Sequence, residues 1–445
     1  MTPAARLQAA IDVLAAMIDE RRPAPDALKS WGQAHRFAGS GDRAAIGGLV
    51  YDALRRKASS AFLMGEDTPR AVVLGMLRRE RGMATDAIAA LASGAQYAAA
   101  ALSDDERKRL DTASLDGAPA HVIGDYPEWL DEAFAQSFGD ARAEEGAALA
   151  SRAPLDLRVN TLKAGRDKAL AMLADLKPEP TPWSPYGLRI MLPADAKAPP
   201  IHAEPAFIKG FVEVQDEGSQ LAALFSGAKP GEQALDLCAG AGGKTLALAA
   251  MMENKGQLFA TDDDKRRLAP IHDRLARSGA RNVQVRTPKS IHTELDDLKG
   301  RMDLVLIDAP CTGTGAWRRN PDAKWRMRPG ALEQRVKEQA DILDRAVEFL
   351  KPGGRIVYIT CSVLDAENGA QVRGFLARHD GFAALPGAAM AEATGLTDGF
   401  ARAARLTADG ILMTPKTTQT DGFFVSVIKR GRIPRSRRNP GQKTS

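Results

Sequence analysis

Two of the three cysteines of this chain stand where a side chain can do chemistry. Cys311 follows the strand-like run MDLVLID within DAPCTGTG, and Cys361 ends the strand-like run RIVYITC. A single cysteine is more often a buried structural residue than a reactive one. Two cysteines at strand ends, each followed by a small polar residue, weaken that interpretation. Because neighbouring strand ends of a doubly wound sheet converge on one ligand site, we expect both thiols to lie near Asp308.

A thiol is useful where one group must both attack and leave. Carbon 5 of cytosine reacts poorly with a methyl sulfonium, but a thiolate that adds to carbon 6 turns the ring into an enamine whose carbon 5 can attack the methyl group. A base then removes the proton from carbon 5, and elimination releases the thiolate. A carboxyl group such as that of Asp308 can stabilise the addition near the ring nitrogen, and Lys244 could supply a second charged contact.

A glycine-rich turn, CAGAGGKT (Cys238–Thr245), follows the strand-like run ALDLC. Such a turn brings backbone and a helix N-terminus close to a ligand. It is not a Walker A phosphate loop, because position 238 is Cys, nor a complete GxGxxG fingerprint, because Thr245 takes the last glycine position. The next strand ends in Asp262, whose carboxylate can accept the ribose hydroxyls of a nucleoside cofactor. Asp263 and Asp264 are more typical of helix capping.

These motifs fit a sheet in which strands and helices alternate from residue 221 to 430. That order predicts an α/β fold with a parallel, doubly wound sheet and helices on both faces. Ligands bind at the carboxyl ends of the strands in such sheets, which is where the motifs fall. The expected strands are Ala234–Cys238, Gly256–Asp262, Val283–Thr287, Met302–Asp308, Arg355–Cys361 and Gly422–Lys429, and the clearest helix is Ala331–Leu350.

Two further units precede this sheet. Residues 1–145 are Ala-rich with helical spacing, and we expect an all-helical domain. Residues 146–220 read as a small α/β module, with strand-like runs at Leu155–Leu162, Gly187–Leu192 and Gly210–Asp216. In the helical domain, Arg36–Lys57 mixes an apolar face with basic residues, which is more typical of a solvated bundle helix than of a binding surface.

Basic and aromatic residues alternate after Cys311. The segment Gly315–Gly330 contains five basic residues and two tryptophans. Cations bind phosphates and flat rings stack on bases, so this segment predicts a nucleic-acid surface beside the site. The alternative is a solvated loop whose tryptophans anchor it in the core.

The chain has 445 residues, of which 44% are hydrophobic and 26% charged, a composition ordinary for a globular protein of two or three domains. The net charge is +5, but the last 17 residues contain seven Lys or Arg and no acid, so the rest carries −2. A basic, Pro-containing tail that is poor in apolar residues, here 431–445, should be disordered.

Several classes of protein are not favoured by this composition. No apolar run approaches the length of a membrane helix, and the amphipathic N-terminal segment does not read as a signal peptide, so we expect a cytoplasmic location. Three widely spaced cysteines and six scattered histidines indicate reduced thiols and no metal site. The sequence shows no dimerisation heptad, so we expect a monomer.

Taken together, the motifs resemble those of the RsmB/NOP (Sun) family of RNA cytosine-C5 methyltransferases. CAGAGGKT resembles its cofactor loop, DAPCTGTGAWRRNPDAKW its fourth motif and YITCSVLDAEN its sixth. QDEGSQLAALF and LRVNTL resemble segments that precede its catalytic domain, and DGFF its closing strand. The resemblance covers residues 150–430. The helices of residues 1–145 are similar, more weakly, to the NusB-like RNA-binding domain of RsmB-type members, which points to small-subunit (16S) ribosomal RNA.

The resemblance implies a Rossmann-like class I methyltransferase domain that uses S-adenosylmethionine. Cys361 would be the nucleophile at carbon 6, and Cys311 would assist resolution of the covalent RNA adduct. Asp308 would contact the target base, and Lys244 would position it. Arg158 and Asn160 would fall in an RNA-contacting module. The implied cofactor-binding residues are Cys238, Ala239, Gly240, Ala241, Gly242, Gly243, Lys244, Asp262, Arg267, Thr287 and Asp308.

The chain departs from the family pattern at two places. The usual loop reads CAAPGGKT, whereas Gly240 and Ala241 stand here for Ala and Pro, which makes the turn less rigid. The third strand of the family usually ends in an Asp that contacts the adenine, whereas here Thr287, Pro288 and Lys289 follow the strand. Backbone or Thr287 must then make the adenine contact, or the contact is weaker.

Three other functions stay open at this point. A DNA cytosine methyltransferase would place its nucleophile on the fourth-strand Pro-Cys, and the presence of Cys361 argues against that class. A non-catalytic RNA-binding factor in ribosome assembly would need only the helical domain, the Trp/Arg segment (Gly315–Gly330) and the basic tail. The thiol pair and Lys244 favour an enzyme instead. The same reaction on transfer RNA or another RNA is the third.

Overall fold

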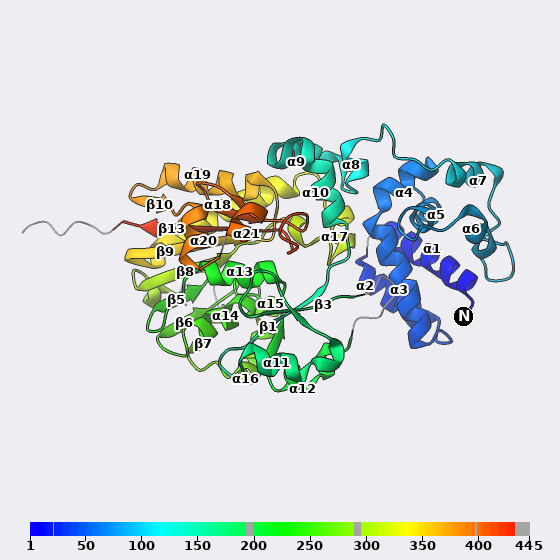
Figure 1. Ribbon diagram of the computed structural model, residues 1–445. Helices are drawn as coiled ribbons and strands as arrows, with labels where there is room; N and C mark the ends of the chain where they lie inside the picture. Colours follow the sequence, from blue (N-terminus) through cyan, green and yellow to red (C-terminus); the bar gives the residue numbers. More distant parts are fainter. Residues whose placement is uncertain (21, 193–198, 289–294, 397, 432–445) are drawn as a thin grey trace, which may run out of the picture.

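The computed structural model describes residues 1–20, 22–192, 199–288, 295–396 and 398–431. A helical domain, a small antiparallel sheet and a large mixed sheet follow one another along the chain. The helical domain lies at one end of the molecule and the sheets form the rest (Figure 1). No helix among the described residues is long and apolar enough to cross a membrane. The expected basic tail lies outside the described residues from position 432 onward.

Helices form the described chain up to Leu149. Residues Ala71–Leu77 of α5 are all buried, so this helix is enclosed by its neighbours. A Cβ atom at Gly75 would lie 2.6 Å from the Ser60 carbonyl oxygen, so α4 and α5 pack backbone to backbone. The helices are α1 (Pro3–Glu20), α2 (Ala24–Ala34), α3 (Ser40–Arg55), α4 (Lys57–Met64), α5 (Pro69–Arg79), α6 (Thr85–Leu91), α7 (Asp104–Asp111), α8 (Ala120–Ile123), α9 (Asp131–Phe138) and α10 (Arg142–Leu149).

The small sheet is antiparallel at every pairing. Its apolar side chains, among them Leu157 and Leu188 at paired positions and Val212 on the next strand, are fully buried. They pack against Ala169 of α11 (Arg166–Met172) in a separate core. Its strands, in spatial order, are β2 (Glu179–Pro180), β3 (Gly187–Ile190), β1 (Leu155–Val159) and β4 (Val212–Val214), and α12 (Pro205–Ile208) precedes β4.

The large sheet is built on five parallel strands in the order β7–β6–β5–β8–β9. The chain direction across the sheet reverses between β5 and β8, the switch point where ligands bind in Rossmann-like folds. The strands of this sheet are β5 (Gln233–Asp236), β6 (Gln257–Ala260), β7 (Val283–Val285), β8 (Met302–Asp308), β9 (Leu350–Thr360), β10 (Phe382–Ala384), β11 (Arg405–Leu406), β12 (Ile411–Met413) and β13 (Phe423–Arg430).

The expectation of an all-parallel sheet is wrong at one edge. Strand β13 pairs antiparallel with β9, with Phe424 opposite Thr360, and β12 and β11 continue the antiparallel pairing. The chain returns from β12 without a crossover helix, and antiparallel strands allow such a connection. Strand β13 therefore begins at the carboxyl edge of the parallel strands, which brings Asp421 and Gly422 to the end of β9.

Helices cover both faces of the sheet (Figure 1). Leu304 and Leu306 of β8 face the cluster that includes α13 (Glu217–Phe225) and α14 (Gly243–Met251). Val305 and Ile307 face the opposite cluster, which includes α18 and α19. Burial on both faces explains why these strands are continuous apolar runs. The remaining helices are α15 (Lys265–Leu268), α16 (Ile271–Ser278), α17 (Pro321–Arg326), α18 (Ala331–Ala346), α19 (Gly369–Arg378), α20 (Gly387–Ala393) and α21 (Asp398–Ala403).

The Trp/Arg segment after Cys311 docks onto the helical domain. Lys324 is 1% exposed, and its ammonium donates to the carbonyl oxygens of Arg55 and Asp125 at 2.9 and 2.6 Å. The indole N–H of Trp325 donates to the Leu54 carbonyl at 2.6 Å. Helix α17 is thus clamped against the C-terminal end of α3.

This docking differs from the predicted nucleic-acid surface. Trp317 is buried and stacks on Phe134, with ring centroids 5.8 Å apart. Arg318 is buried as well, whereas Arg326 and Arg328 are exposed. Trp317 is therefore not available to stack on a base, whereas Trp325 is partly exposed at the boundary with the helical domain.

The variant Lys324→Met tests the docking. Methionine leaves the carbonyls of Arg55 and Asp125 without this donor, and a buried polar group left without its partner costs about 1–3 kcal/mol. We expect the midpoint of urea unfolding to fall and proteolysis between the helical domain and the small sheet to become faster. Lys337→Met, at an exposed position of α18, is the matched control. Equal midpoints for the two variants would contradict the docking.

Candidate active site

The sulfur atoms of Cys311 and Cys361 lie 3.3 Å apart. Cys361 directly follows β9, and Cys311 lies in the loop after β8, its parallel neighbour. The N–H of Gly315 donates to the Cys361 carbonyl at 2.9 Å and ties the two segments together. The structure thus brings both thiols to the carboxyl edge of the sheet, where open α/β sheets bind ligands.

The surroundings of Cys311 and Cys238 determine the protonation of their thiols. The hydrogen bond with Cys361, and then burial, raise the pKa of the Cys311 thiol well above its usual range. Cys311 therefore keeps its proton at neutral pH and can act as the donor in the contact between the sulfur atoms. Burial likewise raises the pKa of the Cys238 thiol, so Cys238 is a poor nucleophile.

Glu367, which carried no signal in the sequence, holds the Cys311 loop. The N–H and hydroxyl of Thr312 donate to its two carboxylate oxygens at 2.8 and 2.5 Å. The side-chain amide of Gln339 donates to it at 3.0 Å, and Glu367 is fully buried. Charge-assisted bonds of this kind are roughly twice as strong as neutral ones, so this carboxylate sets the path of the loop.

An ion pair lies at the same edge. The Lys244 ammonium is 2.7 Å from Oδ2 of Asp308, which ends β8. Lys244 belongs to the first turn of α14, and its ammonium lies 5.0 Å from the ring centroid of Phe423 at the start of β13. The cation is held between a carboxylate and an aromatic face, so it has a defined position at the edge.

The glycine turn is closed by a carboxylate. Asp262 is 3% exposed, and its two oxygens accept the N–H groups of Gly240 and Asp264, each at 2.9 Å. Gly240 and Gly242 have φ values of +49° and +84°, and a Cβ atom at Gly242 would lie 2.5 Å from Ile271. The turn therefore needs glycine at these positions. A carboxylate has about four acceptor sites, so Asp262 can still accept two hydroxyls, which fits the ribose of a nucleoside cofactor.

The other implied cofactor residues are placed as follows. The rest of the turn, with Cys238, Ala239, Ala241 and Gly243, links β5 to α14. Arg267 is half-exposed, with its guanidinium 3.9 Å from the Asp262 carboxylate. Thr287 is exposed beyond the end of β7, and the neighbouring Lys289 lies outside the described residues. Thr287 therefore lies at the carboxyl edge of the parallel strands, as predicted, but no contact with the glycine turn is described for it.

Two family models match this chain. One, described as 16S rRNA methyltransferase RsmB/F, matches residues 224–429, and the other, described as the ferredoxin-like domain of RsmF/B-like methyltransferases, matches residues 126–197. Over these regions the chain is similar to RsmB/F methyltransferases. The matched regions contain the thiol pair, the glycine turn and most of the small sheet.

A named relative shows the same similarity. Ribosomal RNA small subunit methyltransferase B of Salmonella arizonae is 38% identical over 279 residues, which are 62% of this chain and 60% of that protein. The match thus spans less than two thirds of the relative.

Solved structures show the same fold. The protein PH0851 aligns over 97% of this chain and 99% of its own, with a TM-score of 0.69 and 24% identity. NSun6 from Pyrococcus horikoshii, solved with SFG, aligns over 70% of this chain and all of its own, with a TM-score of 0.58 and 22% identity. The first likeness extends the shared fold to the helical domain.

Beneath the loop that follows Cys311 lies a buried charge cluster. Arg318 and Arg319 each pair with both Asp216 and Asp421. The N–H of Asp421 donates to the Asp216 carboxylate at 3.0 Å, and Arg319 also donates to the Pro154 carbonyl at 3.1 Å. The cluster therefore joins the loop after Cys311 to α13, to the start of β13 and to the chain entering the small sheet.

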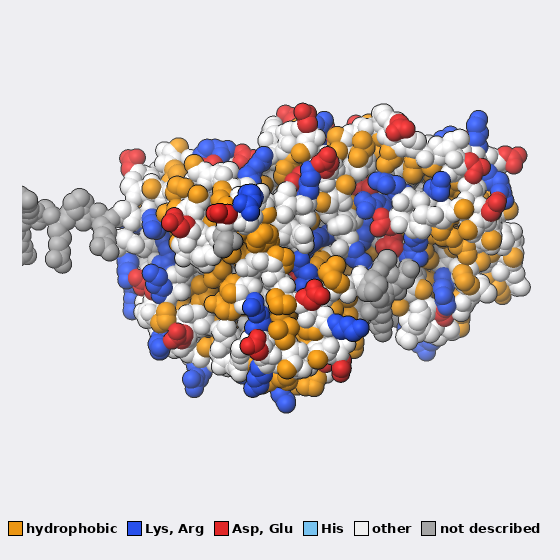
Figure 2. All heavy atoms as spheres, viewed as in Figure 1, with side chains coloured by type: hydrophobic (Ala, Val, Ile, Leu, Met, Phe, Trp, Pro, Cys, Tyr) orange, Lys and Arg blue, Asp and Glu red, His pale blue; other side chains and the backbone are white. Residues whose placement is uncertain are grey.

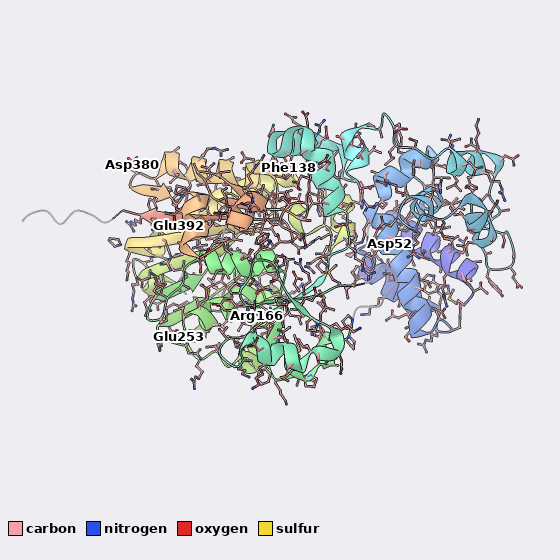
Figure 3. All side chains as sticks on the ribbon, viewed as in Figure 1. Asp52, Phe138, Arg166, Glu253, Asp380 and Glu392 are labelled. Atoms are coloured by element: carbon pink, nitrogen blue, oxygen red, sulfur yellow. The ribbon has the colours of Figure 1, made fainter. Side chains whose placement is uncertain are left out.

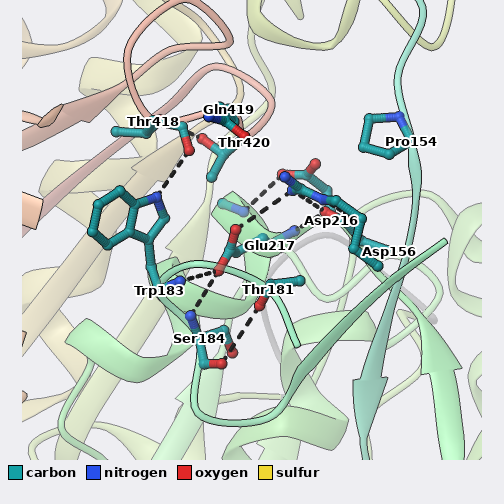
Figure 4. A network of polar contacts seen from close by, with 12 residues as sticks. Pro154, Asp156, Thr181, Trp183, Ser184, Asp216, Glu217, Thr418, Gln419 and Thr420 are labelled. Carbon is teal, nitrogen blue, oxygen red and sulfur yellow. Dashed lines mark hydrogen bonds and ion pairs between the residues drawn. The ribbon is translucent and has the colours of Figure 1, made fainter. Parts of the chain in front are cut away.

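A second set of polar contacts extends this junction (Figure 4). The carboxylate of Glu217 accepts the N–H groups of Trp183 and Ser184 at 2.6 and 2.7 Å, while Arg189 bridges Asp156 and Glu217. The Trp183 indole donates to the Thr418 carbonyl at 2.9 Å. These bonds attach the small sheet to the loop that leads into β13.

Arg158 and Asn160 lie in the module that the sequence predicted but are not exposed for RNA. Arg158 is 5% exposed and donates to Gln215 and to the Gly243 carbonyl at 2.7 and 2.8 Å. Asn160 is 4% exposed and donates to the carbonyls of Gly210 and Ser278. Both side chains fasten the module to the large domain, because each has one partner there, Gly243 for Arg158 and Ser278 for Asn160.

Gly315 offers a test of how closely the site is packed. A Cβ atom there would lie 2.1 Å from the Gly422 carbonyl oxygen, so Gly315→Ala must displace the loop after Cys311. We expect the free energy of unfolding to fall by about 1–3 kcal/mol, as for other overpacked sites. Gly41→Ala, where a Cβ atom meets nothing within 4 Å, is the control. Unchanged urea unfolding of Gly315→Ala would contradict this geometry.

Asp236 predicts a pH dependence of stability. It is fully buried at the end of β5, Oδ2 accepts the Thr245 hydroxyl at 2.7 Å, and Oδ1 has no hydrogen-bond partner among the described residues. Burial, partly offset by Thr245, raises its pKa from 3.8 to about 7. The unfolded carboxyl loses its proton first as the pH rises, so the folded state loses stability between about pH 4 and 7.

The variant Asp236→Asn lacks this titration. The unfolding free energy of the wild type should therefore fall relative to that of the variant from pH 4 to pH 7. Above pH 7 the difference between the two proteins should stay constant. The measurement is urea unfolding at unit steps of pH. A constant difference over the whole range would show that Asp236 does not titrate with a raised pKa.

Proposed function

We propose that this chain transfers a methyl group from S-adenosylmethionine to carbon 5 of a cytosine in RNA, with Cys361 as the attacking nucleophile. The observation that carries the proposal is the 3.3 Å separation of the Cys311 and Cys361 sulfur atoms at the carboxyl edge of the sheet. The Lys244–Asp308 ion pair and the glycine turn lie at this same edge.

The chemistry divides between the two thiols. The Cys361 sulfur adds to carbon 6 as a thiolate, and carbon 5 attacks the methyl group, whose bonding electrons stay with the departing cofactor sulfur. A base then removes the proton from carbon 5, and the S–C6 bond breaks to return the thiolate. Cys311, which is protonated, donates a hydrogen bond to that sulfur and so stabilises it as nucleophile and as leaving group. This donor role is how Cys311 would assist resolution of the RNA adduct.

Lys244 and Asp308 would act on the base. When a thiolate adds to carbon 6, electron density moves toward the pyrimidine ring, and a carboxyl or ammonium group near the ring nitrogen stabilises it. The pair is already held by its 2.7 Å contact and by Phe423, so little reorganisation is needed when charge develops. Asp308 would contact the target base, and Lys244 would position it.

The cofactor would lie along the glycine turn. S-adenosylmethionine supplies an electrophilic methyl group on a sulfonium. Asp262 would accept its ribose hydroxyls, and the backbone of Gly240, which is partly exposed and has no side chain, would lie against it. NSun6 from Pyrococcus horikoshii, which has the same fold, was solved with SFG.

Small-subunit ribosomal RNA is the substrate that the relatives favour. The family model and the relatives carry 16S or small-subunit ribosomal RNA in their names. The helical domain would be a NusB-like RNA-binding domain. Transfer RNA stays a second candidate. A DNA enzyme of this chemistry would use the Pro-Cys of Cys311 as its nucleophile, and a non-catalytic assembly factor would have no need of the thiol pair.

Two variants separate the roles of the thiols. Cys361→Ala should lower methyl transfer to an in vitro small-subunit ribosomal RNA transcript by roughly a thousandfold or more, because the nucleophile is gone. Cys311→Ala should instead retain attack but slow release, so a covalent protein–RNA complex should accumulate on a denaturing gel. Methylated positions are read by bisulfite sequencing.

The double variant Cys311→Ala/Cys361→Ala is the control, since the complex must disappear if it forms through Cys361. An active Cys361→Ala together with an inactive Cys311→Ala would reverse the roles and favour the DNA-type mechanism. A wild-type protein that binds no S-adenosylmethionine in calorimetry would favour the assembly factor. Bisulfite sequencing of RNA from a strain that lacks the protein would identify the target.

A further inference from the structure

A groove of about 830 Å³ runs from the helical domain to the loop that follows Cys311. Six arginines line it: Arg6, Arg43, Arg55 and Arg81 from the helical domain, Arg152 from the connecting chain, and Arg319 from the loop. Among the described residues that line it, Asp52 is the one acid. Asp52 pairs with Arg81 at 2.7 Å, and burial raises the pKa of its carboxyl above the usual value. Arg6 and Arg319 pair with Asp42 and Asp216, which lie outside the groove lining, so the positive charge of the groove is compensated only in part.

Arg55 lies at the centre of this groove in an unusual state. It is 8% exposed, and its Nη1 atom donates to the carbonyls of Ser151 and Arg318. Its Nε atom is buried and has no hydrogen-bond partner among the described residues. Burial lowers the pKa of this guanidinium to about 10, and the nearby carboxylate of Asp52 offsets only part of this shift. An anion in the groove would supply what Arg55 lacks.

The floor of the groove admits close approach. It is formed by one side of α3, where Gly41, Ala44, Ala45, Gly47 and Gly48 line the groove. Gly41, Arg43 and Ala44 are exposed, so the floor is open to solvent. Small side chains let an extended chain of phosphates lie against the helix while arginines at the walls reach it.

The groove joins the two functional parts of the molecule. Asp52 marks the side of α3 that faces the rest of the chain, and Lys and Arg side chains are visible along this boundary (Figures 2 and 3). At its far end Arg319 belongs to the segment that begins at Cys311. A polyanion in the groove would therefore extend toward the thiol pair.

We propose that this groove binds the phosphate backbone of the RNA substrate and fixes its path from the helical domain to the cysteine loop. The proposal rests on the proposed function for the identity of the polyanion. The groove sets affinity, whereas the thiols set the rate of chemistry. Changes in the groove should therefore act on the KM for RNA and leave kcat unchanged.

The variant Arg43→Gln/Arg152→Gln removes two charges at exposed positions. Binding of a small-subunit ribosomal RNA transcript is measured by filter binding at several salt concentrations. We expect affinity to fall roughly tenfold to a hundredfold at low salt and the slope of log K against log salt to become shallower by about 1.4, since each contact with single-stranded RNA contributes about 0.7. Arg107→Gln/Lys108→Gln, at exposed positions of α7, is the matched control.

A second variant adds charge instead of removing it. Ala44→Glu places a carboxylate on the groove floor and should weaken RNA binding without removing any arginine. Ala87→Glu, exposed on α6 and not part of the groove lining, should not. Thermal unfolding of all four variants checks that the helical domain is intact.

The outcomes separate this proposal from the proposed function. Wild-type affinity and salt slope in both groove variants would overturn the groove, even if the wild type methylates RNA. A wild type that fails to methylate cytosine would overturn the proposed function, while the binding measurements would still decide the groove. Displacement of RNA by poly-glutamate but not by a second RNA would indicate an acidic protein partner and would also overturn the proposal.

Discussion

The arrangement of this molecule depends on the buried cluster in which Arg318 and Arg319 meet Asp216 and Asp421. Buried charges are costly, and removing one partner leaves another uncompensated, typically at about 3–5 kcal/mol. Four segments of the chain therefore have to meet at one point. One of them is the loop that carries Cys311, so the separation of the two sulfur atoms follows from the position of this cluster.

The stretch that begins at Asp308 connects chemistry to architecture. It first meets Lys244, then the second thiol, then the charge cluster, and it ends with Lys324 bound to carbonyls of the helical domain. The helical domain is thus attached to the catalytic loop itself. A displacement of that domain would be felt where the thiols lie, because packed elements transmit strain.

The local pattern of apolar residues was enough to predict the strands that are buried on both faces. The run Met302–Asp308 is the strand β8 with the predicted ends, because two covered faces produce an uninterrupted apolar segment. Local pattern failed where a polar side chain depends on a distant partner. Arg318 reads as an exposed cation until Asp421 lies beside it, and Lys324 until Arg55 does. The direction of β13 depends in the same way on a connection that hydrophobic spacing does not record.

The antiparallel edge strand has a consequence for the order of events during synthesis. Asp421, Gly422 and Phe423 follow every other part of the site along the chain, and each of them completes a contact made by an earlier residue. While the chain is being made, N-terminal parts fold first. Arg318 and Arg319 therefore lack the carboxylate of Asp421 until the end of the chain has been synthesised. The nascent protein can therefore form its helical domain and parallel strands well before its two thiols are aligned. The complete site forms only when the last strand, β13, has been made.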